Sequence, residues 1–377
     1  MNVLHLVSCR GWSSDAYWAA RITTELERAG HEVTLVCRRG SGARVIERAR
    51  EIGASRIETL AFRGGLKPAG DLADLRRLLE WLPTTDILHV HRGKEHWLAA
   101  LANRLSRTPR PLFRTRHIVQ PVRPHALNRW LYHEATQMVI TVTEAIRRQY
   151  VAAGLVAPER VEAVPGGVDI QRFLPSVEPA TLRLSLGIPE GVALIGCVSG
   201  LRVMKGHPVI VEAAAELARR GCRFHLVLIG QGGMEERIRA AVARTGLGDR
   251  VSVLGFVPDL PRAIATFDLA LYAPLESDGM SRVLFEYLAM GKPVIASRVG
   301  VVPEALEDGE TALTVPAGEA RPLAAAIERL LDDARLRTRL GSAAAALCAS
   351  RLSGARVAAR LATLYHDAAA RVRMPAA

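Results

Sequence analysis

The sequence predicts an α/β protein made of two doubly wound, Rossmann-like domains. The chain has 377 residues, which is more than a single hydrophobic core usually organises. In both halves, short apolar runs suited to buried parallel strands alternate with stretches of helical periodicity. Between the halves, residues 161–175 lose this periodicity around Pro165, Gly166 and Gly167, which indicates an interdomain connection. We therefore expect a first domain at residues 1–172 and a second at 173–354.

The first half alternates strands and helices regularly. Strands are predicted at Val3–Val7, Glu32–Cys37, Ile87–His91, Leu112–Thr115 and Met138–Thr143. Helices are predicted at Asp15–Ala29, Arg44–Ile52, Leu72–Trp81, Glu95–Leu105 and Glu144–Ala153. Such alternation favours a parallel sheet with helices on both of its faces.

The second half repeats the pattern and then becomes helical. Strands are predicted at Leu194–Val198, Phe224–Ile229, Val251–Leu254, Leu269–Tyr272, Val294–Ala296 and Ala312–Val315. A helix at Pro208–Arg220 separates the first two of these strands. After Pro322 the chain is nearly all helix, and Leu352–Val372 forms a long amphipathic segment. Ligands of doubly wound sheets bind at the carboxyl ends of the strands, so the loops there are the candidates for chemistry.

Composition predicts a cytoplasmic protein. No apolar run approaches the ~18 residues of a membrane span. Residues 1–8 lack a basic region and are typical of a first buried strand, not of a signal peptide. The cysteines are scattered without C-x-x-C spacing, as expected of free thiols in a reducing compartment: Cys9, Cys37, Cys197, Cys222 and Cys348.

Positive charge is concentrated in the first half. Of the net charge of +12, residues 1–175 carry +9, from 26 basic and 17 acidic side chains. Residues 104–133 combine seven arginines with apolar and aromatic side chains, a pattern that favours an anionic membrane surface as a partner. Nucleic acid is disfavoured because no nucleic-acid-binding motif accompanies the charge. A solvated Arg-rich surface is the remaining alternative.

The segment Leu275–Arg298 predicts a ligand site. It is a tight loop, a helix, a glycine stop at Gly291 and a buried strand. A glycine-containing loop that leads into a helix N-terminus can bind an anion, because free backbone N–H groups and the helix dipole point the same way. Asp278 in the loop and Glu286 inside the helix bracket that anion site and can accept hydrogen bonds from hydroxyls. This combination suits a ligand that is part phosphate and part sugar, although an ordinary capped helix would share the pattern.

This segment resembles the signature of the retaining family 4 glycosyltransferases. In that family two acids eight positions apart precede a sequence like L-A-M-G-K-P-V-I-A-S (288–297), and here Asp278 replaces the first glutamate. R-A-G-H-E-V-T-L-V-C (28–37) and V-P-G-G-V-D (164–169) are also similar to family segments, so the resemblance covers almost the whole chain. It implies the GT-B fold, in which two Rossmann-like domains face a cleft. It also implies that a C-terminal helix at about 355–377 crosses back onto the first, acceptor-side domain.

The resemblance implies roles for the second domain as the nucleotide-sugar-binding domain. Glu286 would hold the ribose and Asp278 the hydroxyls of the donor sugar. The residues implied to bind the donor through the backbone or as a loop are Gly230, Phe256, Val257, Gly279, Met280 and Ser281. Arg202 and Lys205 would neutralise the departing diphosphate. The family commonly has its arginine five residues before the lysine, where this chain has Gly200; Arg202 fits the rarer spacing of three.

In the first domain the resemblance implies that His117 lines the donor-sugar pocket. Cys9–Asp15 corresponds to a loop in which relatives carry two glycines, here Ser13 and Ser14, although Gly11 is present. Serine N–H groups can still donate to a diphosphate, but its close approach is more restricted. A lone histidine is more often structural, and a plain helix N-cap would explain the serines.

We expect neither a metal ion nor a cofactor. His89, His91, Glu95 and His96 contain too few assured ligands for a metal site, and no dinucleotide or Walker loop is present. The expected function is retaining, metal-independent transfer of a sugar from a UDP- or GDP-type donor to a glycan or lipid-linked acceptor. Bacterial cell-surface polysaccharide or lipopolysaccharide synthesis would be the setting, on the inner face of the membrane. A sugar-nucleotide epimerase, a phosphorylase with a pyridoxal-binding lysine and a non-catalytic binding protein are the alternatives.

Overall fold

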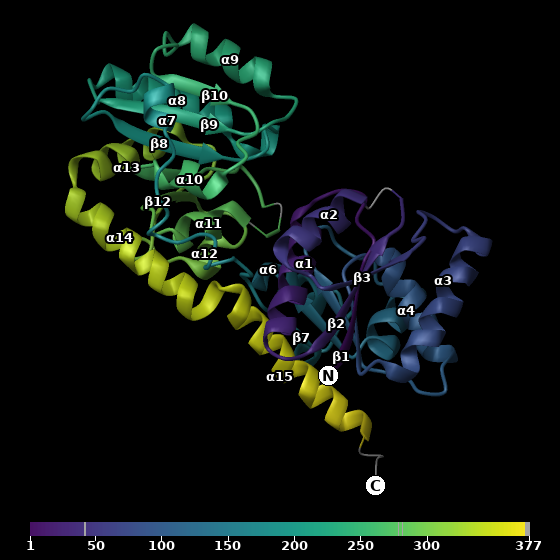
Figure 1. Cartoon of the computed structure of the whole chain (residues 1–377). Coiled ribbons are helices and arrows are strands. Elements are labelled where there is room, and N and C mark those ends of the chain that lie inside the picture. The colour runs from purple at the N-terminus through teal and green to yellow at the C-terminus, as the bar shows by residue number, and fades with distance from the viewer. Residues whose placement is uncertain (41–42, 278, 281, 374–377) are drawn as a thin grey trace. The chain divides into compact units, whose positions relative to one another are not determined.

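The computed structural model describes residues 1–40, 43–277, 279–280 and 282–373 (Figure 1). It divides into two compact units, one formed by Met1–Gly167 with the C-terminal stretch from Ser353, the other by Val168–Leu352. Each unit is a parallel sheet with helices packed on it. The predicted α/β class, with two doubly wound sheets, is confirmed.

In the described part of the first unit, seven parallel strands follow the order β3-β2-β1-β4-β5-β6-β7. The strands are β1 Asn2–Val7, β2 Glu32–Arg38, β3 Arg56–Leu60, β4 Ile87–Val90, β5 Leu112–Arg116, β6 Met138–Thr141 and β7 Val161–Ala163. The α-helices are α1 Ser14–Arg28, α2 Ala43–Ile52, α3 Pro68–Trp81, α4 Gly93–Leu105, α5 Ala126–Arg129, α6 Glu144–Ala152 and α15 Gly354–Arg373. Short helical turns are η1 Leu82–Thr84, η2 Trp130–Ala135 and η3 Pro158–Arg160.

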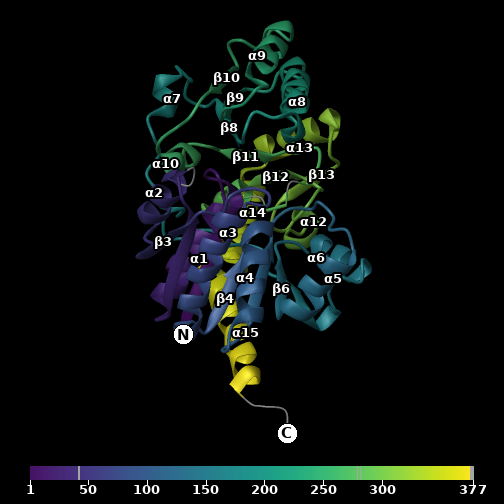
Figure 2. The ribbon, with the colours of Figure 1, turned by 90° about the vertical axis from the view of Figure 1, so that its right-hand side faces the viewer.

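The strand order of this unit reverses between β1 and β4. Helices α1, α2 and α15 pack together on one face of the sheet, and α3 and α4 pack together on the other (Figure 2). All four residues of β4 are buried, as a strand covered on both faces requires. The β1–β4 reversal is the point where a doubly wound sheet offers its ligand crevice.

Strand β3 of the first unit was not predicted. Strand β3 reads R-I-E-T-L and lies at the edge of the sheet, next to β2. Its side chains alternate between exposed and partly buried positions, so it lacks the continuous apolar run of a central strand. The short strand β7 lies in the segment that was assigned to the interdomain connection, and the five predicted strands lie within two residues of their observed bounds.

The described part of the second unit has six parallel strands in the order β10-β9-β8-β11-β12-β13, which reverses between β8 and β11. The strands are β8 Ala193–Val198, β9 Phe224–Ile229, β10 Val251–Leu254, β11 Leu269–Tyr272, β12 Val294–Ser297 and β13 Leu313–Val315. The α-helices are α7 Leu182–Ser185, α8 His207–Arg219, α9 Glu235–Arg244, α10 Leu260–Ala265, α11 Arg282–Ala289, α12 Val302–Ala305, α13 Ala320–Asp332 and α14 Ala334–Leu347. Short helical turns are η4 Val203–Lys205 and η5 Cys348–Leu352.

The chain leaves the first unit through two glycines with positive φ, Gly166 at 113° and Gly167 at 98°. A Cβ atom on Gly167 would stand only 3.1 Å from the ring of Trp18. The next residue, Val168, donates its N–H to the carbonyl of Leu352 over 3.2 Å. The two points at which the chain passes between the units therefore lie side by side.

The last helix, α15, belongs to the first unit and packs on α1. A Cβ atom on Gly354 would stand 3.1 Å from Cγ of Glu25, so glycine permits a close approach of the two helices. Arg360 donates two hydrogen bonds of 2.6 Å to the carboxylate of Glu162. None of the helices in the described part of the chain has both the length and the apolar character that crossing a bilayer demands.

Candidate functional site

The loop between β8 and α8 carries the two cations expected to bind a diphosphate. Arg202 is exposed and Lys205, at the end of η4, is half-buried. Helix α8 begins directly after Gly206, whose φ is 71°. A Cβ atom there would stand 2.1 Å from the carbonyl oxygen of Ala273, so only glycine fits. The tight turn places the loop that carries both cations directly before the first turn of α8, and the start of a helix is suited to an anion.

The loop after β9 packs directly on the loop after β8. A Cβ atom on Gly230 would stand 1.9 Å from the Ser199 carbonyl oxygen, and one on Gly232 would stand 2.3 Å from that of Leu201. The N–H of Leu201 donates to the Gln231 carbonyl over 2.9 Å. Gly230 and Gly232 are thus required by the contact of the two loops, whereas a Cβ atom on Gly233 would meet nothing within 4 Å. The part of Gly230 in donor binding stays a prediction.

Helix α11 buries the carboxylate of Glu286, which is 2% exposed. Its Oε1 lies 3.1 Å from Nε of Arg282, whereas its Oε2 is buried and has no partner among the described residues. Burial raises the pKa of Glu286, although the charges of Arg282 and Arg172 oppose this. A buried carboxylate oxygen without a donor costs free energy, which a ligand hydroxyl would recover.

A neighbouring side chain fixes α11 against the end of β8. Tyr287 is fully buried, and its hydroxyl accepts a hydrogen bond of 2.6 Å from the N–H of Val198. The start of the Arg202 loop and the helix that carries Glu286 are therefore held together. Nothing in the sequence pattern distinguished Tyr287 from a core residue.

The loop before α11 is described only in part. Gly279 has a φ of 95° and donates its N–H to the Ser277 hydroxyl over 3.2 Å, and Met280 is buried. Asp278 and Ser281 lie outside the described residues, so their expected roles stay predictions. Gly291, at the other end of the helix, has the left-handed φ of 63° predicted for a C-cap.

The segment after β10 presents an aromatic ring to solvent. Phe256 is 65% exposed, and Val257 is half-buried. A Cβ atom on the preceding residue, Gly255, would stand 3.8 Å from Nε2 of Gln231, so the segment borders the β9 loop. An exposed ring at this position offers an apolar plane to a planar group of a ligand.

In the first unit, the loop after β1 ends in a helix cap. Ser13 is the N-cap of α1, and its hydroxyl is hydrogen-bonded to the carboxylate of Asp15. Ser14 is exposed, and a Cβ atom on Gly11 would meet nothing within 4 Å. Burial would raise the pKa of Asp15, but His117, Ser13 and the Arg92 guanidinium together lower it to about 2. The carboxylate is therefore ionised at neutral pH.

His117 follows β5 and is 5% exposed. Its Nε2 lies 3.0 Å from Nδ1 of His91, and its Nδ1 is buried without a partner among the described residues. Burial lowers the pKa of His117 to about 3; Asp15 opposes this shift, and the positive charge of Arg114 adds to it. The imidazole is thus neutral and has one ring nitrogen available to a ligand.

The four residues considered as metal ligands, His89, His91, Glu95 and His96, do not form one group in the structure. His89 and His91 join His5 of β1 in a buried group whose nitrogens lie within 4.8 Å of one another. Glu95 instead caps α4 by accepting from the N–H of Arg92 over 2.6 Å. His96 bonds Thr136 over 2.8 Å. His5 was not predicted to belong to this group, because a single histidine in an apolar strand does not indicate a ligand site.

His207, the first residue of α8, was also not singled out. It is fully buried, and its Nε2 lies 3.0 Å from the hydroxyl of Ser199 in the β8 loop. Burial lowers its pKa to about 4, with a further contribution from the charge of Lys205. A neutral His207 can tie the start of α8 to the loop without adding to the charge of the two cations.

Comparison with known proteins decides the family. Residues 193–333 match the family model described as Glycosyl transferases group 1, and residues 16–172 match that of Glycosyltransferase Family 4. The chain belongs to this glycosyltransferase family. It is similar to the D-inositol 3-phosphate glycosyltransferase of Acidothermus cellulolyticus, with 32% identity over 275 residues. That match covers 66% of this chain and 60% of the relative.

Solved glycosyltransferase structures share the fold. One from Rickettsia africae superposes with a TM-score of 0.84 at 19% identity, covering 97% of this chain and 98% of the other. Anabaena Alr3699/HepE in complex with UDP gives a TM-score of 0.82 at 21% identity, covering 97% of this chain and all of the other. The fold of the chain is therefore GT-B, as the sequence predicted.

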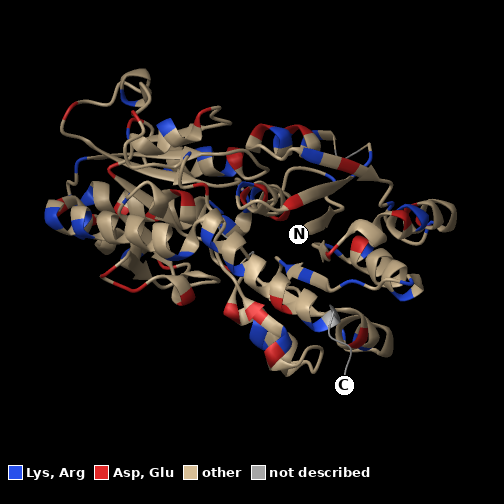
Figure 3. Cartoon of the chain, turned by 60° about the horizontal axis from the view of Figure 1, so that its bottom comes forward, with Lys and Arg blue, Asp and Glu red and all other residues tan. Residues whose placement is uncertain are grey.

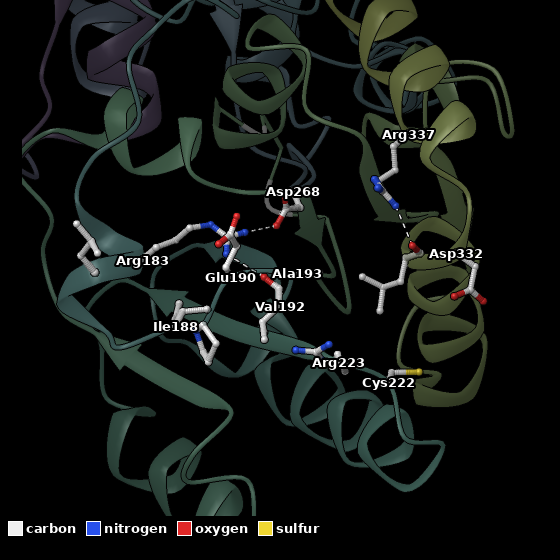
Figure 4. Close-up of a pocket in the computed structure, with 14 residues that line it drawn as sticks. Arg183, Ile188, Glu190, Val192, Ala193, Cys222, Arg223, Asp268, Asp332 and Arg337 are labelled. Carbon is white, nitrogen blue, oxygen red and sulfur yellow. Dashed lines mark hydrogen bonds and ion pairs between the residues drawn. The ribbon is translucent and has the colours of Figure 1, made fainter.

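A large hollow of the second unit lies away from the residues discussed so far (Figure 4). Its volume is about 780 Å³, and Ala193, the first residue of β8, helps to line it, so it opens at the amino ends of the strands. The Arg183 guanidinium donates to the Asp268 carboxylate and that of Arg337 to backbone carbonyls. Because these arginines already have protein partners and the strands end on the opposite side, we do not assign the donor to this hollow.

The Arg-rich run of residues 104–133 is only partly on the surface. Lys and Arg alternate with Asp and Glu on many exposed helices (Figure 3). Arg114 was counted in the basic surface, but it is 2% exposed and points into the core from β5. We call the exposed side chains of α4, of α5 and of the segments next to them the α4–α5 surface: Leu101, Arg104, Leu105, Arg107, Ile118, Arg123, Leu127 and Arg129.

Proposed function

We propose that the chain is a retaining, metal-independent glycosyltransferase that moves a sugar from a UDP-type nucleotide sugar to a hydroxyl of a glycan or lipid-linked acceptor. The donor would bind to the unit formed by Val168–Leu352. The observation that carries the proposal is the contact between helix α11, with the buried Oε2 of Glu286, and the end of β8, which leads directly into the loop with Arg202 and Lys205.

The two parts of this site match the two parts of a nucleotide sugar. Arg202, Lys205 and the start of α8 supply positive charge for a diphosphate. The open Oε2 of Glu286 can accept a hydrogen bond from a ribose hydroxyl. The exposed ring of Phe256 and the backbone beside Val257 would lie against the base. The HepE structures contain UDP and UDP-glucose, which supports uridine as the base.

The chemistry follows from these charges. The bond between the anomeric carbon and the diphosphate oxygen breaks, and the acceptor oxygen bonds to the same face of that carbon. The proton of the acceptor hydroxyl passes to the departing phosphate oxygen, so that no protein base is needed. Arg202 and Lys205 stabilise the negative charge that develops on the diphosphate. His117 would accept from or donate to a hydroxyl of the transferring sugar through Nδ1. Gly11, Ser13 and Ser14 would border the diphosphate and the acceptor.

Two classes of acceptor fit the proposed activity. Synthesis of bacterial surface polysaccharide or lipopolysaccharide at the inner face of the membrane would suit the α4–α5 surface. The relative from Acidothermus is called a D-inositol 3-phosphate glycosyltransferase, so a soluble phosphorylated polyol is the alternative acceptor class. Co-sedimentation with vesicles, argued in the Discussion, separates the two.

A thermal-shift series tests the donor. UDP-, GDP- and ADP-glucose are compared at equal concentrations, and UDP-glucose should raise the unfolding temperature most. A ligand at 100 times its dissociation constant stabilises a protein by ~2.7 kcal/mol. Hydrolysis of UDP-glucose followed by NMR should release α-glucose first, as retention requires. Release of β-glucose would overturn the retaining mechanism, and binding without any turnover would favour a non-catalytic protein. Epimerisation of the sugar nucleotide would favour the epimerase alternative.

A further inference from the structure

The buried histidines of the first unit form a chain that ends at His117. Thr23 of α1 bonds Nδ1 of His5 over 2.9 Å, and Nε2 of His5 bonds Nε2 of His91 over 2.5 Å. Nδ1 of His91 then bonds Nε2 of His117 over 3.0 Å. The ring edges of Trp18 pack against His91 and His117, with centroids 5.5 and 5.3 Å apart.

Each imidazole of this chain is neutral. Burial lowers the pKa of His5 and of His117 to about 3 and holds that of His91 well below its usual value. A neutral imidazole has one N–H and one bare nitrogen, so it can donate only one of its two hydrogen bonds. In a chain of such rings the position of one proton therefore determines the positions of the others.

Only two arrangements satisfy all the bonds. In the first, His5 carries its proton on Nδ1, His91 on Nε2 and His117 on Nε2, which leaves Nδ1 of His117 as an acceptor. In the second, the protons are on Nε2 of His5, Nδ1 of His91 and Nδ1 of His117, which then presents a donor. Any mixed set would place two bare nitrogens or two N–H groups against each other in a buried site, which is costly.

The same contacts argue against a metal ion among these rings. Both nitrogens of His5 and both of His91 are used within the chain. His89 bonds the Tyr365 hydroxyl through Nδ1 and the Thr115 hydroxyl through Nε2 over 2.6 Å. A metal ion would have to displace these partners, because a ligating imidazole needs a bare nitrogen facing the ion.

We propose that His91 and His5, with Thr23 at the end, are positioning residues that set the tautomer of His117 and so decide whether its Nδ1 donates to or accepts from the transferring sugar. The proposal rests on the proposed function for the part that concerns the sugar. The tautomer coupling itself is independent of any substrate. His89 lies in the same buried group but outside the chain, which provides a matched comparison.

The first experiment reads the tautomers directly. Spectra of ¹⁵N-histidine-labelled protein distinguish the protonated from the bare nitrogen of each ring. We expect His5, His91 and His117 to show one of the two matched sets. Thr23→Val removes the one acceptor that the described residues offer to an Nδ1–H of His5. It should therefore place the protons on Nε2 of His5 and, through the chain, on Nδ1 of His117. Thr115→Val, an equal loss of a buried hydroxyl, should leave the wild-type set unchanged.

The second experiment measures hydrolysis of UDP-glucose. His91→Phe should lower kcat about tenfold or more with KM nearly unchanged, whereas His89→Phe should stay within about threefold of wild type. If either phenylalanine variant fails to fold, Thr23→Val and Thr115→Val are compared instead. Equal losses in both phenylalanine variants, a mixed tautomer set, or one zinc ion per chain bound by these histidines would overturn the proposal. If wild-type protein does not turn over UDP-glucose, the proposed function fails while the spectra still test the chain.

Discussion

The Nε atom of Arg202 lies 3.5 Å from the point where a Cβ atom on Gly200 would stand. The guanidinium stem is thus folded back beside the position at which relatives commonly carry their arginine. The N–H of Arg202 donates to the Gly200 carbonyl over 2.8 Å, which brings the two residues together. We therefore propose that Arg202, three residues before Lys205, binds the diphosphate in place of an arginine at position 200.

Substitution of Arg202 should mainly reduce turnover. A guanidinium grips two phosphate oxygens, which an ammonium cannot do, so Arg202→Lys should lower kcat and Arg202→Ala should lower it on the order of 100-fold. Steady-state kinetics with UDP-glucose measure both. A normal kcat for Arg202→Ala would show that Lys205 and the start of α8 suffice.

The second-site variant Gly200→Arg should restore part of the activity of Arg202→Ala. A Cβ atom on Gly200 would meet Nε of Arg202 at 3.5 Å and the Gln231 carbonyl oxygen at 3.8 Å, which are ordinary contacts. Gly230→Ala, in the same pair of loops, is the control for a glycine that cannot accept a side chain. Its Cβ atom would stand 1.9 Å from the Ser199 carbonyl oxygen. We expect that control to lower the unfolding temperature without rescuing turnover.

Glu286→Ala should weaken donor binding while leaving the fold intact. It removes a hydrogen bond from a ligand hydroxyl to a charged group, which is worth roughly 1.5–3 kcal/mol. Isothermal titration with UDP-glucose measures the loss. Glu276→Ala is the matched control, because Glu276 is an exposed acid of the preceding loop that lies ten positions before Glu286 instead of eight. Equal donor affinity of Glu286→Ala and wild type would refute the assignment.

Lowering the pH should destabilise the folded chain at pH values well above those at which carboxylates usually titrate. The pKa values of His5 and His117 are lowered to about 3 and that of His207 to about 4, so these rings are neutral when folded and take up protons when unfolded. Their contribution is present above pH ~6.5 and is lost as the pH falls toward the folded pKa values. Each such histidine should cost about 1.4 kcal/mol per pH unit in that window. Urea unfolding from pH 7.5 to 5 measures this, and a flat midpoint would mean that the rings are protonated in the folded protein.

The sequence predicted the elements that carry continuous apolar runs and left the polar or isolated features unseen. Helix α11 and strand β12 followed from periodicity and from the glycine between them. Strand β3 was missed because an edge strand with alternating polar residues has no apolar run. The chain of His5, His91 and His117 could not be predicted, because it depends on the register of β1, β4 and β5 in the sheet. Conversely, Arg114 was assigned to the surface because charge alone does not reveal which face of a strand it occupies.

Vesicle binding should depend on anionic lipid and on the α4–α5 surface. That surface includes four exposed arginines, Arg104, Arg107, Arg123 and Arg129, and four exposed apolar side chains. Each should contribute about 1 kcal/mol of attraction near an anionic leaflet, and the attraction should fade with salt. Sedimentation with vesicles rich in phosphatidylglycerol, compared with neutral ones, measures the difference.

The double variant Arg104→Gln with Arg107→Gln should reduce binding more than tenfold if about 2 kcal/mol is lost. The exposed Arg237 and Arg244 of α9, changed to Gln as the control, should leave binding as it is. Equal binding to both kinds of vesicle, or none, would remove the membrane from the proposal and favour a soluble phosphorylated acceptor.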